Sequence, residues 1–578
     1  MKFIEVAEVF QEIEPISGRL AMTDMLAALL KKADPAQASI IVNLAIGQLR
    51  PPFLGNQFNM AKKSLIPVVA DLLDRSEETV TAHEKKLGDL GLVVQEYVWS
   101  VDKHLTVRQV YDALCAIEEI RGTGSQEVKA EKTLALLKQV DALSAKFIVR
   151  IILDKLRLGF SDMTVLDALS VMEVGDKSLR DALEHAYNIS VDIGLIAQTL
   201  KEKGVKAIEQ MKIQIGIPIR PAAAERLPDA ESIIKKIGES IAQPKIDGFR
   251  LQIHVDTTGS IPKVEFFSRN LIDMSAMFPE LKHAFEKFPA KTFICEGEAI
   301  VYHPETKTYL PFQETVKRKR KHNIDAVKEE LPLKVILFDL LYLNGKSMLD
   351  ESHVSRRQAL EKVMEKFNDP QVELIEEKVF NDPVKLHTYF LECIDAGLEG
   401  LVVKKPDAIY RPGKRDFNWI KLKRQAGSEL EDTVDCVVLG YYFGRGKRVD
   451  LGIGALLVGV YNEKEALFQT VAKVGTGLSE AAWIELRKKC DAVAVKEKPK
   501  NVVCAKELTP DVWTSPEIVI EVFADEITIS PMHTAGQTKD FLGYGLRFPR
   551  FMGYRSDKKP MQATSVQEIA RMFQDQRK

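Results

Sequence analysis

The pattern of apolar and polar positions predicts helices over roughly the first 210 residues. In LTVRQVYDALCAIEEI apolar residues recur at helical spacing, and Thr106 and Gln109 are spaced as in a capping box. RLAMTDMLAALLKKA and AKFIVRIILDKLRLG behave similarly, and the latter helix is expected to stop at Gly159. No fixed-period repeat is evident, which argues against a solenoid. The sequence therefore predicts an all-α domain over residues 1–211.

The pattern changes after the proline-containing stretch IGIPIRPAAAERLPDAE. Short β-rich runs (RLQIHV, KVEFFS, TFICEGEAIVY, KVILFDLLYL and EGLVVKK) then alternate with the helical segments SRRQALEKVMEKF and PVKLHTYFLECIDAG. This mixture predicts an α+β domain over residues 212–427. Beyond it, shorter strands and glycine-rich turns predict a small barrel of five or six strands, an OB-fold, over residues 428–578.

Composition restricts the class of protein. The 578 residues are 45% hydrophobic and 28% charged, as expected of a folded multidomain protein. The net charge of −2 means that a nucleic-acid partner would have to be met by local basic surfaces. Six cysteines without a CxxC pair argue against a zinc site or a disulfide framework and fit a reducing compartment. No signal peptide or membrane span is seen, so a cytoplasmic location is expected.

The segment KIDGFR at 245–250 places a lysine, an acid and an arginine around a tight turn. A lysine amine becomes a nucleophile when its surroundings lower its pKa, and neighbouring cations have that effect. The spacing therefore suggests that Lys245 forms a covalent bond to phosphorus. Taken alone, the segment also fits a solvated hairpin, because short charged turns are common.

Downstream residues supply parts that such a reaction needs. Arg269 ends a strand, and the CEGE segment puts carboxylates into an apolar strand, where they must be paired, exposed at a cleft or bound to metal. An exposed edge-strand carboxylate is the alternative, and Phe338 in its strand equally fits a core aromatic. Lys421 and Lys423 share one strand face, which is unfavourable unless an anion such as a polyphosphate lies between them. With EGLVVK at 399–404, these are the parts for attack on a nucleoside triphosphate assisted by metal.

In this order, KIDGFR, FFSRN, CEGE, FDLLYLNG, EGLVVK and WIKLK resemble the signature of the covalent nucleotidyltransferases. Further motifs lie outside that set: PFQETVKRKRK at 311–321, DTVDCVVLGYYFGRGKR at 432–448, LRFPRFMGYRSDKKP at 546–560, and GTGSQEVK and LRLGFSDMTVLDAL in the helical region. Together the motifs extend over nearly the whole chain. They resemble the ATP-dependent DNA ligases of the archaeal and eukaryotic replicative type.

The resemblance implies a role for each matching position. Lys245 would be the adenylylated lysine, and Glu298 and Glu399 would bind metal. The residues expected to contact the nucleotide are Gln243, Arg250, Arg269, Glu298, Phe338, Lys404, Arg415, Lys421 and Lys423. Those expected to contact DNA are Ser125, Arg157, Phe312, Arg547, Phe548 and Arg550, with the two phenylalanines pressed into the minor groove. Those expected to close over the triphosphate are Arg555, Asp557 and Lys558. Core positions for Phe312 and Phe548, and a solvated charge run at 317–321, are the alternatives.

Two positions depart from the family pattern. Many relatives have glutamate two residues before the nucleophile, accepting from the adenine amino group, where this chain has Gln243. The amide oxygen of Gln243 can accept the same bond, but its NH2 group could donate to a different base. The other departure is conservative, since Glu296 stands where relatives usually have aspartate.

The expected activity is the sealing of nicks in duplex DNA through a lysyl-AMP and a 5′-adenylylated DNA intermediate, in replication, repair and recombination. ATP and magnesium, with manganese as a substitute, are the expected cofactors, and the protein is expected to be a nucleoid-associated monomer. Binding to a sliding clamp stays open, because VVQEYVW has Gln95 and Trp99 but lacks paired aromatics. The alternatives are a capping-type guanylyltransferase or RNA ligase, and an inactive protein that binds DNA breaks.

Overall fold

A computed structural model describes residues 1–54, 58–99, 101, 104–154, 156, 158–303, 308–309, 332–423, 433–444, 448–449 and 451–576. Arg157 and Phe312 lie outside these ranges, as does the basic run at 317–321. The chain divides into two compact units, Met1–Leu73 with Tyr97–Lys423, and Asp74–Glu96 with Arg424–Lys578. In the described part of the chain, no helix has the length and apolar character needed to cross a membrane.

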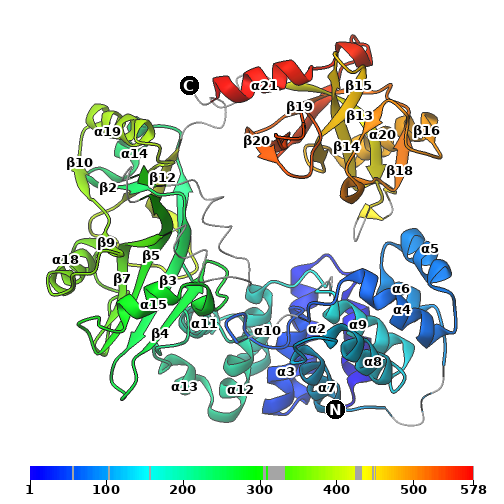
Figure 1. The fold of residues 1–578 in the computed structure, drawn as a ribbon. Helices are drawn as coiled ribbons and strands as arrows, with labels where there is room; N and C mark the ends of the chain where they lie inside the picture. Colours follow the sequence, from blue (N-terminus) through cyan, green and yellow to red (C-terminus); the bar gives the residue numbers. More distant parts are fainter. Residues whose placement is uncertain are drawn as a thin grey trace. The chain divides into compact units, whose positions relative to one another are not determined.

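The N-terminal region is helical, as predicted (Figure 1). Thr106 caps α7 and exchanges capping-box bonds with Gln109. The helix expected to end at Gly159 stops instead at Ile152, because Asp154 takes a left-handed φ of 55° just beyond it. The helices of this region in the first unit are α1 (Phe3–Ile13), α2 (Arg19–Lys32), α3 (Pro35–Ala45), α4 (Lys62–Leu73), α7 (Val107–Glu118), α8 (Ser125–Leu137), α9 (Ala142–Ile152), α10 (Asp162–Val174), α11 (Arg180–Ser190), α12 (Ile193–Lys203) and α13 (Val205–Glu209).

The middle of the chain forms two sheets, and each β-rich run named above becomes a strand. The five-stranded sheet has the order β1-β12-β11-β2-β10, and the seven-stranded sheet runs β4-β3-β5-β7-β8 with β6 on β5 and β9 on β7. The strands of the first sheet are β1 (Ala223–Arg226), β2 (Ser240–Lys245), β10 (Lys378–Phe380), β11 (Gly400–Lys404) and β12 (Arg415–Lys423). Those of the second are β3 (Phe249–Asp256), β4 (Lys263–Ser268), β5 (Thr292–His303), β6 (Thr308–Tyr309), β7 (Leu333–Leu343), β8 (Lys346–Ser347) and β9 (Val372–Leu374).

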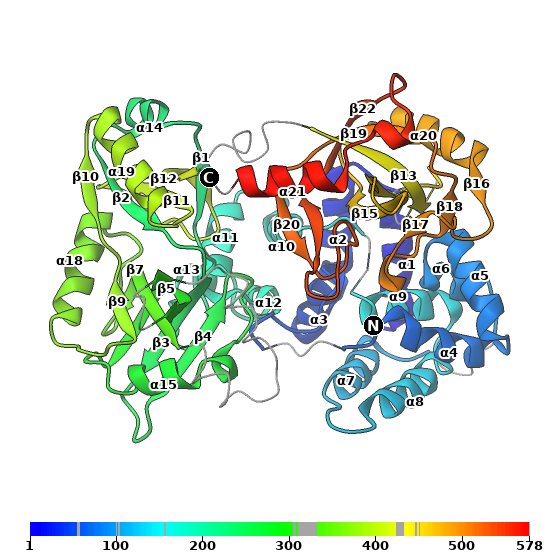
Figure 2. The ribbon, with the colours of Figure 1, turned by 45° about the horizontal axis from the view of Figure 1, so that its top comes forward.

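Helices cover the outer faces of both sheets (Figure 2). An apolar cluster joins α14 (Ala230–Ile237) and α19 (Pro383–Asp395) to the five-stranded sheet. A larger cluster joins α15 (Pro279–Phe285), which follows the 3-10 turn η1 (Ser275–Met277), and α18 (His353–Met364) to the seven-stranded sheet. The inner faces, left uncovered by helices, enclose the site described below. This arrangement confirms the predicted α+β domain.

The second unit is rich in strands. Eight strands form one sheet, with the order β16-β18-β13-β14-β15-β17 and with β19 pairing to β13 and β22, while β20 and β21 form a separate ladder. The strand-rich domain is thus confirmed with more strands than the five or six predicted, and closure into an OB-fold barrel stays a prediction. The elements are α5 (Glu77–Leu87), α6 (Leu90–Gln95), β13 (Val434–Tyr442), β14 (Ala455–Asn462), β15 (Leu467–Val474), α20 (Glu480–Ala492), β16 (Ala494–Val495), β17 (Val502–Val503), η3 (Lys506–Leu508), β18 (Val512–Thr514), β19 (Val519–Phe523), β20 (Glu526–Ser530), β21 (Gly543–Arg547), β22 (Arg550–Tyr554), η4 (Pro560–Gln562) and α21 (Val566–Asp575).

A buried ion pair ties α18 to β7. Arg356 donates to Asp339 through Nε at 2.6 Å and through Nη2 at 3.1 Å, and both side chains are fully buried. Burial alone raises the pKa of Asp339, but the charges of Arg356 and Lys404 outweigh it and hold that pKa well below its usual range. The pair fixes α18 behind the inner face of the seven-stranded sheet.

Replacing Arg356 by methionine is expected to destabilise the protein by about 3–5 kcal/mol, because Asp339 keeps its charge in a site that cannot solvate it. Urea unfolding followed by circular dichroism measures the loss. The control is Arg108→Met, which breaks an exposed pair with Asp112 on one helix and should change stability little. Equal effects of the two substitutions would contradict the assignment.

Candidate active site

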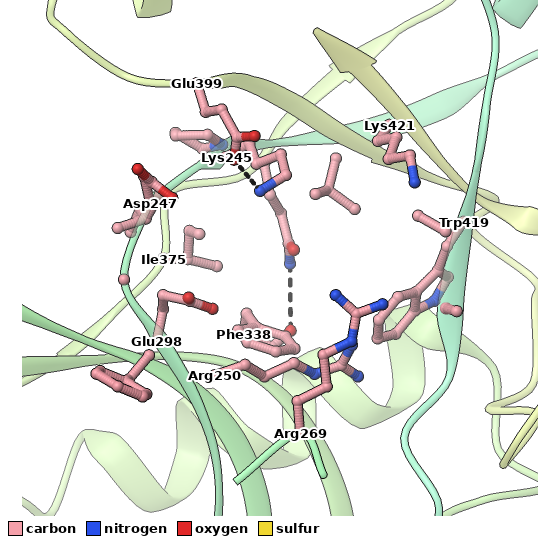
Figure 3. Close-up of a pocket in the computed structure, with 18 of the residues that line it drawn as sticks. Lys245, Asp247, Arg250, Arg269, Glu298, Phe338, Ile375, Glu399, Trp419 and Lys421 are labelled. Atoms are coloured by element: carbon pink, nitrogen blue, oxygen red, sulfur yellow. Dashed lines mark hydrogen bonds and ion pairs between the residues drawn. The ribbon is translucent and has the colours of Figure 1, made fainter. Parts of the chain in front are cut away.

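A cavity of about 510 Å³ lies between the inner faces of the two sheets. Its walls come from β2, β11 and β12 on one side and from β3, β5 and β7 on the other. In Figure 3 the side chains of Lys245, Arg250 and Glu298 all point into this cavity. Its volume is in the range of small-molecule sites.

Lys245 is the last residue of β2, and its amine contacts the Glu399 carboxylate. The main chain fixes this pairing, because Lys245 lies opposite Gly400 in the sheet and its carbonyl accepts from the Glu399 N–H at 3.0 Å. Burial lowers the pKa of Lys245, and Arg269 and Arg250 lower it further, against the opposing charges of Glu298 and Asp247. A lowered pKa enlarges the neutral, nucleophilic fraction of the amine.

Two glycines, Gly248 and Gly400, allow neighbouring backbone segments to approach closely around Lys245. A Cβ at Gly248 would lie 2.5 Å from the carbonyl oxygen of Ala299, so the turn after Lys245 can rest on β5 only without a side chain. Gly400 has a φ of +137° and faces the Leu422 carbonyl so closely that a Cβ would collide with it. Both glycines are therefore required for the close approach of the chain around Lys245.

Arg250 is locked by a carboxylate of the neighbouring strand. Its Nη2 donates to both oxygens of Glu296, at 2.9 and 2.8 Å, and its Nη1 donates to the Ala222 carbonyl at 2.8 Å. Tyr410 donates its hydroxyl to the same carboxylate at 2.9 Å. The Glu296 carboxylate, which lies in an apolar strand, is thus paired. It orients Arg250, as an aspartate at this position could also do.

Glu298, opposite Arg250 across the β3–β5 ladder, is the other acid of this strand and borders the cavity. Burial raises its pKa to about 7, although the charges of Lys245 and Arg250 act in the opposite direction. Among the described residues, no group of three or more His, Cys, Asp or Glu side chains could hold a metal ion. Glu298 and Glu399 still fit Mg²⁺, which takes one or two carboxylates and completes its shell with waters and substrate phosphates.

Phe338 and Trp419 form an aromatic wall, with ring centroids 6.2 Å apart and planes at 78°. The Arg250 guanidinium lies 5.5 Å from each centroid. Sequence reasoning missed Trp419, although it shares a strand face with Lys421 and Lys423 at alternate positions. Because the rings are nearly perpendicular, a base can stack on the face of one ring and contact the other along its edge.

Lys404 lies behind this wall. Its side chain is fully buried, and its Nζ donates to the Phe338 carbonyl at 3.1 Å and to Asp339 at 3.3 Å. It lies 4.3 Å from the Trp419 ring centroid. In this position Lys404 supports the aromatic wall, and its expected contact with phosphate stays a prediction.

Three further cations, Arg269, Lys421 and Lys423, also line the cavity. Lys423 pairs with Glu399, whereas Lys421 and Arg269 have no carboxylate partner among the described residues. Burial and the charges of Arg415 and Arg269 lower the pKa of Lys421. Arg415 is exposed on β12 and does not line the cavity. Such a surplus of positive charge favours an anionic ligand.

Comparisons with known proteins agree with this geometry. Family models match at residues 2–170 (DNA ligase N terminus), 221–423 (ATP dependent DNA ligase domain) and 450–558 (ATP dependent DNA ligase C terminal region). A probable DNA ligase of Dictyoglomus thermophilum is 44% identical over 100% of this chain and 98% of its own length. The DNA ligase of Saccharolobus solfataricus is 38% identical over 100% of this chain and 98% of its own length.

The chain belongs to the ATP-dependent DNA ligases. The solved structure Pmar-Lig_PreS3 resembles it in fold, with a TM-score of 0.57 at 17% identity over 95% of this chain and 99% of that one. The family, the enzyme class and the use of ATP expected from the sequence are thereby confirmed.

The second unit of this ligase holds the predicted site residues between Arg547 and Lys558. Phe548 is 59% exposed and has a φ of 52°, which favours a contact surface over the core position considered above. Arg547, whose guanidinium lies 5.1 Å from the Phe548 ring, pairs with Glu526. Arg550 pairs with Asp525 at 3.2 Å.

Asp435 on β13 pairs with Arg555 and Lys558, the two cations predicted to close over the triphosphate. Arg555 donates to both of its oxygens at 2.9 Å, and Lys558 donates to it at 2.5 Å. Asp557 pairs with Arg555 at 2.9 Å. All of these groups belong to the same unit of the ligase.

Two residues of the helical region, Ser125 with its predicted DNA contact and Trp99 from the stretch considered for clamp binding, lie in the first unit. Ser125 is the first residue of α8. The residue before it, Gly124, has a left-handed backbone conformation. Trp99, from the clamp-like stretch, donates its indole N–H to the Val140 carbonyl at 2.8 Å.

Formation of the covalent lysyl–nucleotide bond is expected to accelerate with pH and then level off below pH 10.5, the ordinary pKa of a lysine, because the pKa of Lys245 is lowered. Single-turnover labelling with ATP across a pH series measures this rate. Transfer of the ligase to each pH immediately before mixing, with activity checked after return to neutral pH, separates titration from denaturation. A rate that still rises tenfold per pH unit at pH 10.5 would contradict the lowered pKa.

Proposed function

We propose that this ligase seals nicks in duplex DNA with Lys245 as the nucleophile. The neutral amine attacks the α-phosphorus of ATP, so that an N–P bond forms, the bond to the pyrophosphate oxygen breaks, and the amine loses a proton. AMP then moves from Lys245 to the 5′-phosphate of the nick. The 3′-hydroxyl attacks that phosphate, which closes the strand and releases AMP. The observation that carries this proposal is an amine with lowered pKa, enclosed with unpaired cations.

The surrounding residues support each part of the nucleotide. Phe338 stacks on the base, Trp419 borders it, and Gln243 lies at its edge. Lys421, Lys423 and Arg269 bind phosphate, and Arg250 contacts the nucleotide beside the aromatic wall. Glu298 and Glu399 would hold Mg²⁺, or Mn²⁺ in its place, which would supply positive charge to offset that of the reacting phosphate.

Three domains, at 1–211, 212–427 and 428–578, are proposed to act on the DNA together. Ser125 and Arg157 would contact it from the helical domain, and Phe312, Arg547, Phe548 and Arg550 from the other two. Arg555, Asp557 and Lys558 would close over the triphosphate during the first step. Because most contacts would be made to the DNA backbone, sequence preference is low and salt sensitivity is high.

Replacing Lys245 by alanine is expected to abolish labelling from ATP and the sealing of an ordinary nick. Sealing of a nick that already carries AMP on its 5′-phosphate should persist, because that step no longer needs the amine. Gel assays with labelled ATP, GTP and both nicks measure these outcomes. The control is Lys263→Ala, an exposed lysine on β4. Normal nick sealing by Lys245→Ala would contradict the proposal. A lysyl adduct that the unmodified ligase forms only from GTP would contradict it as well.

The two predicted roles in the second unit should separate by reaction step. Arg555→Ala is expected to slow lysyl-AMP formation by about 10-fold or more, with little effect on sealing of a pre-adenylylated nick. Phe548→Ala should show the reverse, because it lacks the minor-groove contact but keeps the triphosphate contacts. Both steps are measured on the same preparations. Equal loss of both steps in either variant would contradict the division.

A further inference from the structure

Gln243 contributes a buried amide to the wall of the cavity. It is 2% exposed on β2, two residues before Lys245. Alternate residues of a strand share a face and lie about 7 Å apart. The Gln243 amide and the Lys245 amine can therefore contact two different parts of one ligand. This spacing fits an amide at the base and an amine at the α-phosphate of one nucleotide.

Both partners of the Gln243 amide can only accept hydrogen bonds. Its Nε2 donates to Glu377 Oε1 at 2.6 Å and to the Phe338 carbonyl at 3.2 Å. A carbonyl never donates, and a carboxylate donates only when protonated. The two hydrogens of the Gln243 amide are thereby occupied, and its oxygen has no donor among the described residues.

The surroundings of Glu377 keep it ionised. His353 Nε2 lies 3.0 Å and Arg357 Nη1 3.7 Å from Glu377 Oε1. Burial raises the pKa of Glu377, but His353, Lys404 and Arg357 outweigh it and lower that pKa. His353 and Arg357 both lie on α18, which the Arg356–Asp339 pair holds in place. Glu377 is thus a fixed acceptor that cannot become a donor to Gln243.

We propose that Glu377 sets the base selectivity of this ligase by holding Gln243 with its oxygen toward the cavity and its nitrogen turned away. The oxygen accepts from the 6-amino group of adenine and opposes the 6-oxo group of guanine. The ambiguity of a glutamine at this position is thereby removed by a residue more than a hundred positions along the chain. The inference rests on the proposed function, because it requires a nucleotide with its base at Gln243.

The test compares lysyl–nucleotide formation from labelled ATP and GTP at several concentrations of each. In Glu377→Gln, the new amide offers Gln243 both a donor and an acceptor, so that Gln243 can rotate. The ratio of ATP to GTP efficiency is expected to fall by about 10-fold or more, mainly through KM for ATP. The matched control is Glu376→Gln, the neighbouring acid, which accepts from Tyr389 at 3.0 Å and should keep the ratio.

A swapped pair makes the test independent of simple damage. In the double variant Gln243→Glu with Glu377→Gln, the carboxylate at 243 accepts from adenine in any orientation, while the amide at 377 donates to it. Selectivity for ATP is expected to return toward the original ratio. Circular dichroism of each variant checks that its fold is unchanged.

An unchanged ratio in Glu377→Gln, or no recovery in the swapped pair, would overturn the inference. Absence of any lysyl adduct in the unmodified ligase would instead reject the proposed function.

Discussion

Charge enclosed between two sheets is the constraint on which this site depends, because a charged side chain removed from water needs a counter-charge close by. Arg250 has Glu296, and Arg356 has Asp339. These pairs lie on adjacent strands or on a strand and its covering helix, so the fold fixes their geometry. Lys421 is an exception, because it lines the cavity with no acid partner among the described residues. The site therefore combines paired charges that fix its geometry with a cation that is left without a counter-charge.

The same constraint explains why Lys245, and not Lys404, is the proposed nucleophile. Lys245 and Lys404 are both removed from water, and burial lowers the pKa of each. The Lys404 amine, however, donates to the Phe338 carbonyl and to Asp339. Among the described residues, the Lys245 amine contacts only the Glu399 carboxylate, at the surface of the cavity. Burial alone does not make a nucleophile. The amine must also be reachable once its partner is engaged elsewhere.

The sequence allowed the strands, the order of the elements and the chemistry of the cavity to be predicted, because those depend on local pattern and on short motifs. Lys245, Glu298, Phe338 and Lys421 all line one cavity, as the motifs implied.

What escaped prediction depends on pairing between distant segments. The partner of Gln243 is Glu377, in a segment with no motif of its own. The helix expected to reach Gly159 ends early through a single left-handed residue. Residues 74–96 pack with the C-terminal unit although they follow helices of the first. None of these contacts leaves a periodic signal in the sequence.

Because Asp435 already pairs with Arg555 and Lys558, the proposed binding of triphosphate at those cations would exchange one anion for another. The net free energy of such an exchange is the difference between two pairings, that of the cations with triphosphate and that of the cations with Asp435. It is therefore smaller than the free energy of either pairing. After pyrophosphate departs, Asp435 would pair with both cations again. An internal anion of this kind would favour release of the triphosphate site between rounds of the proposed reaction.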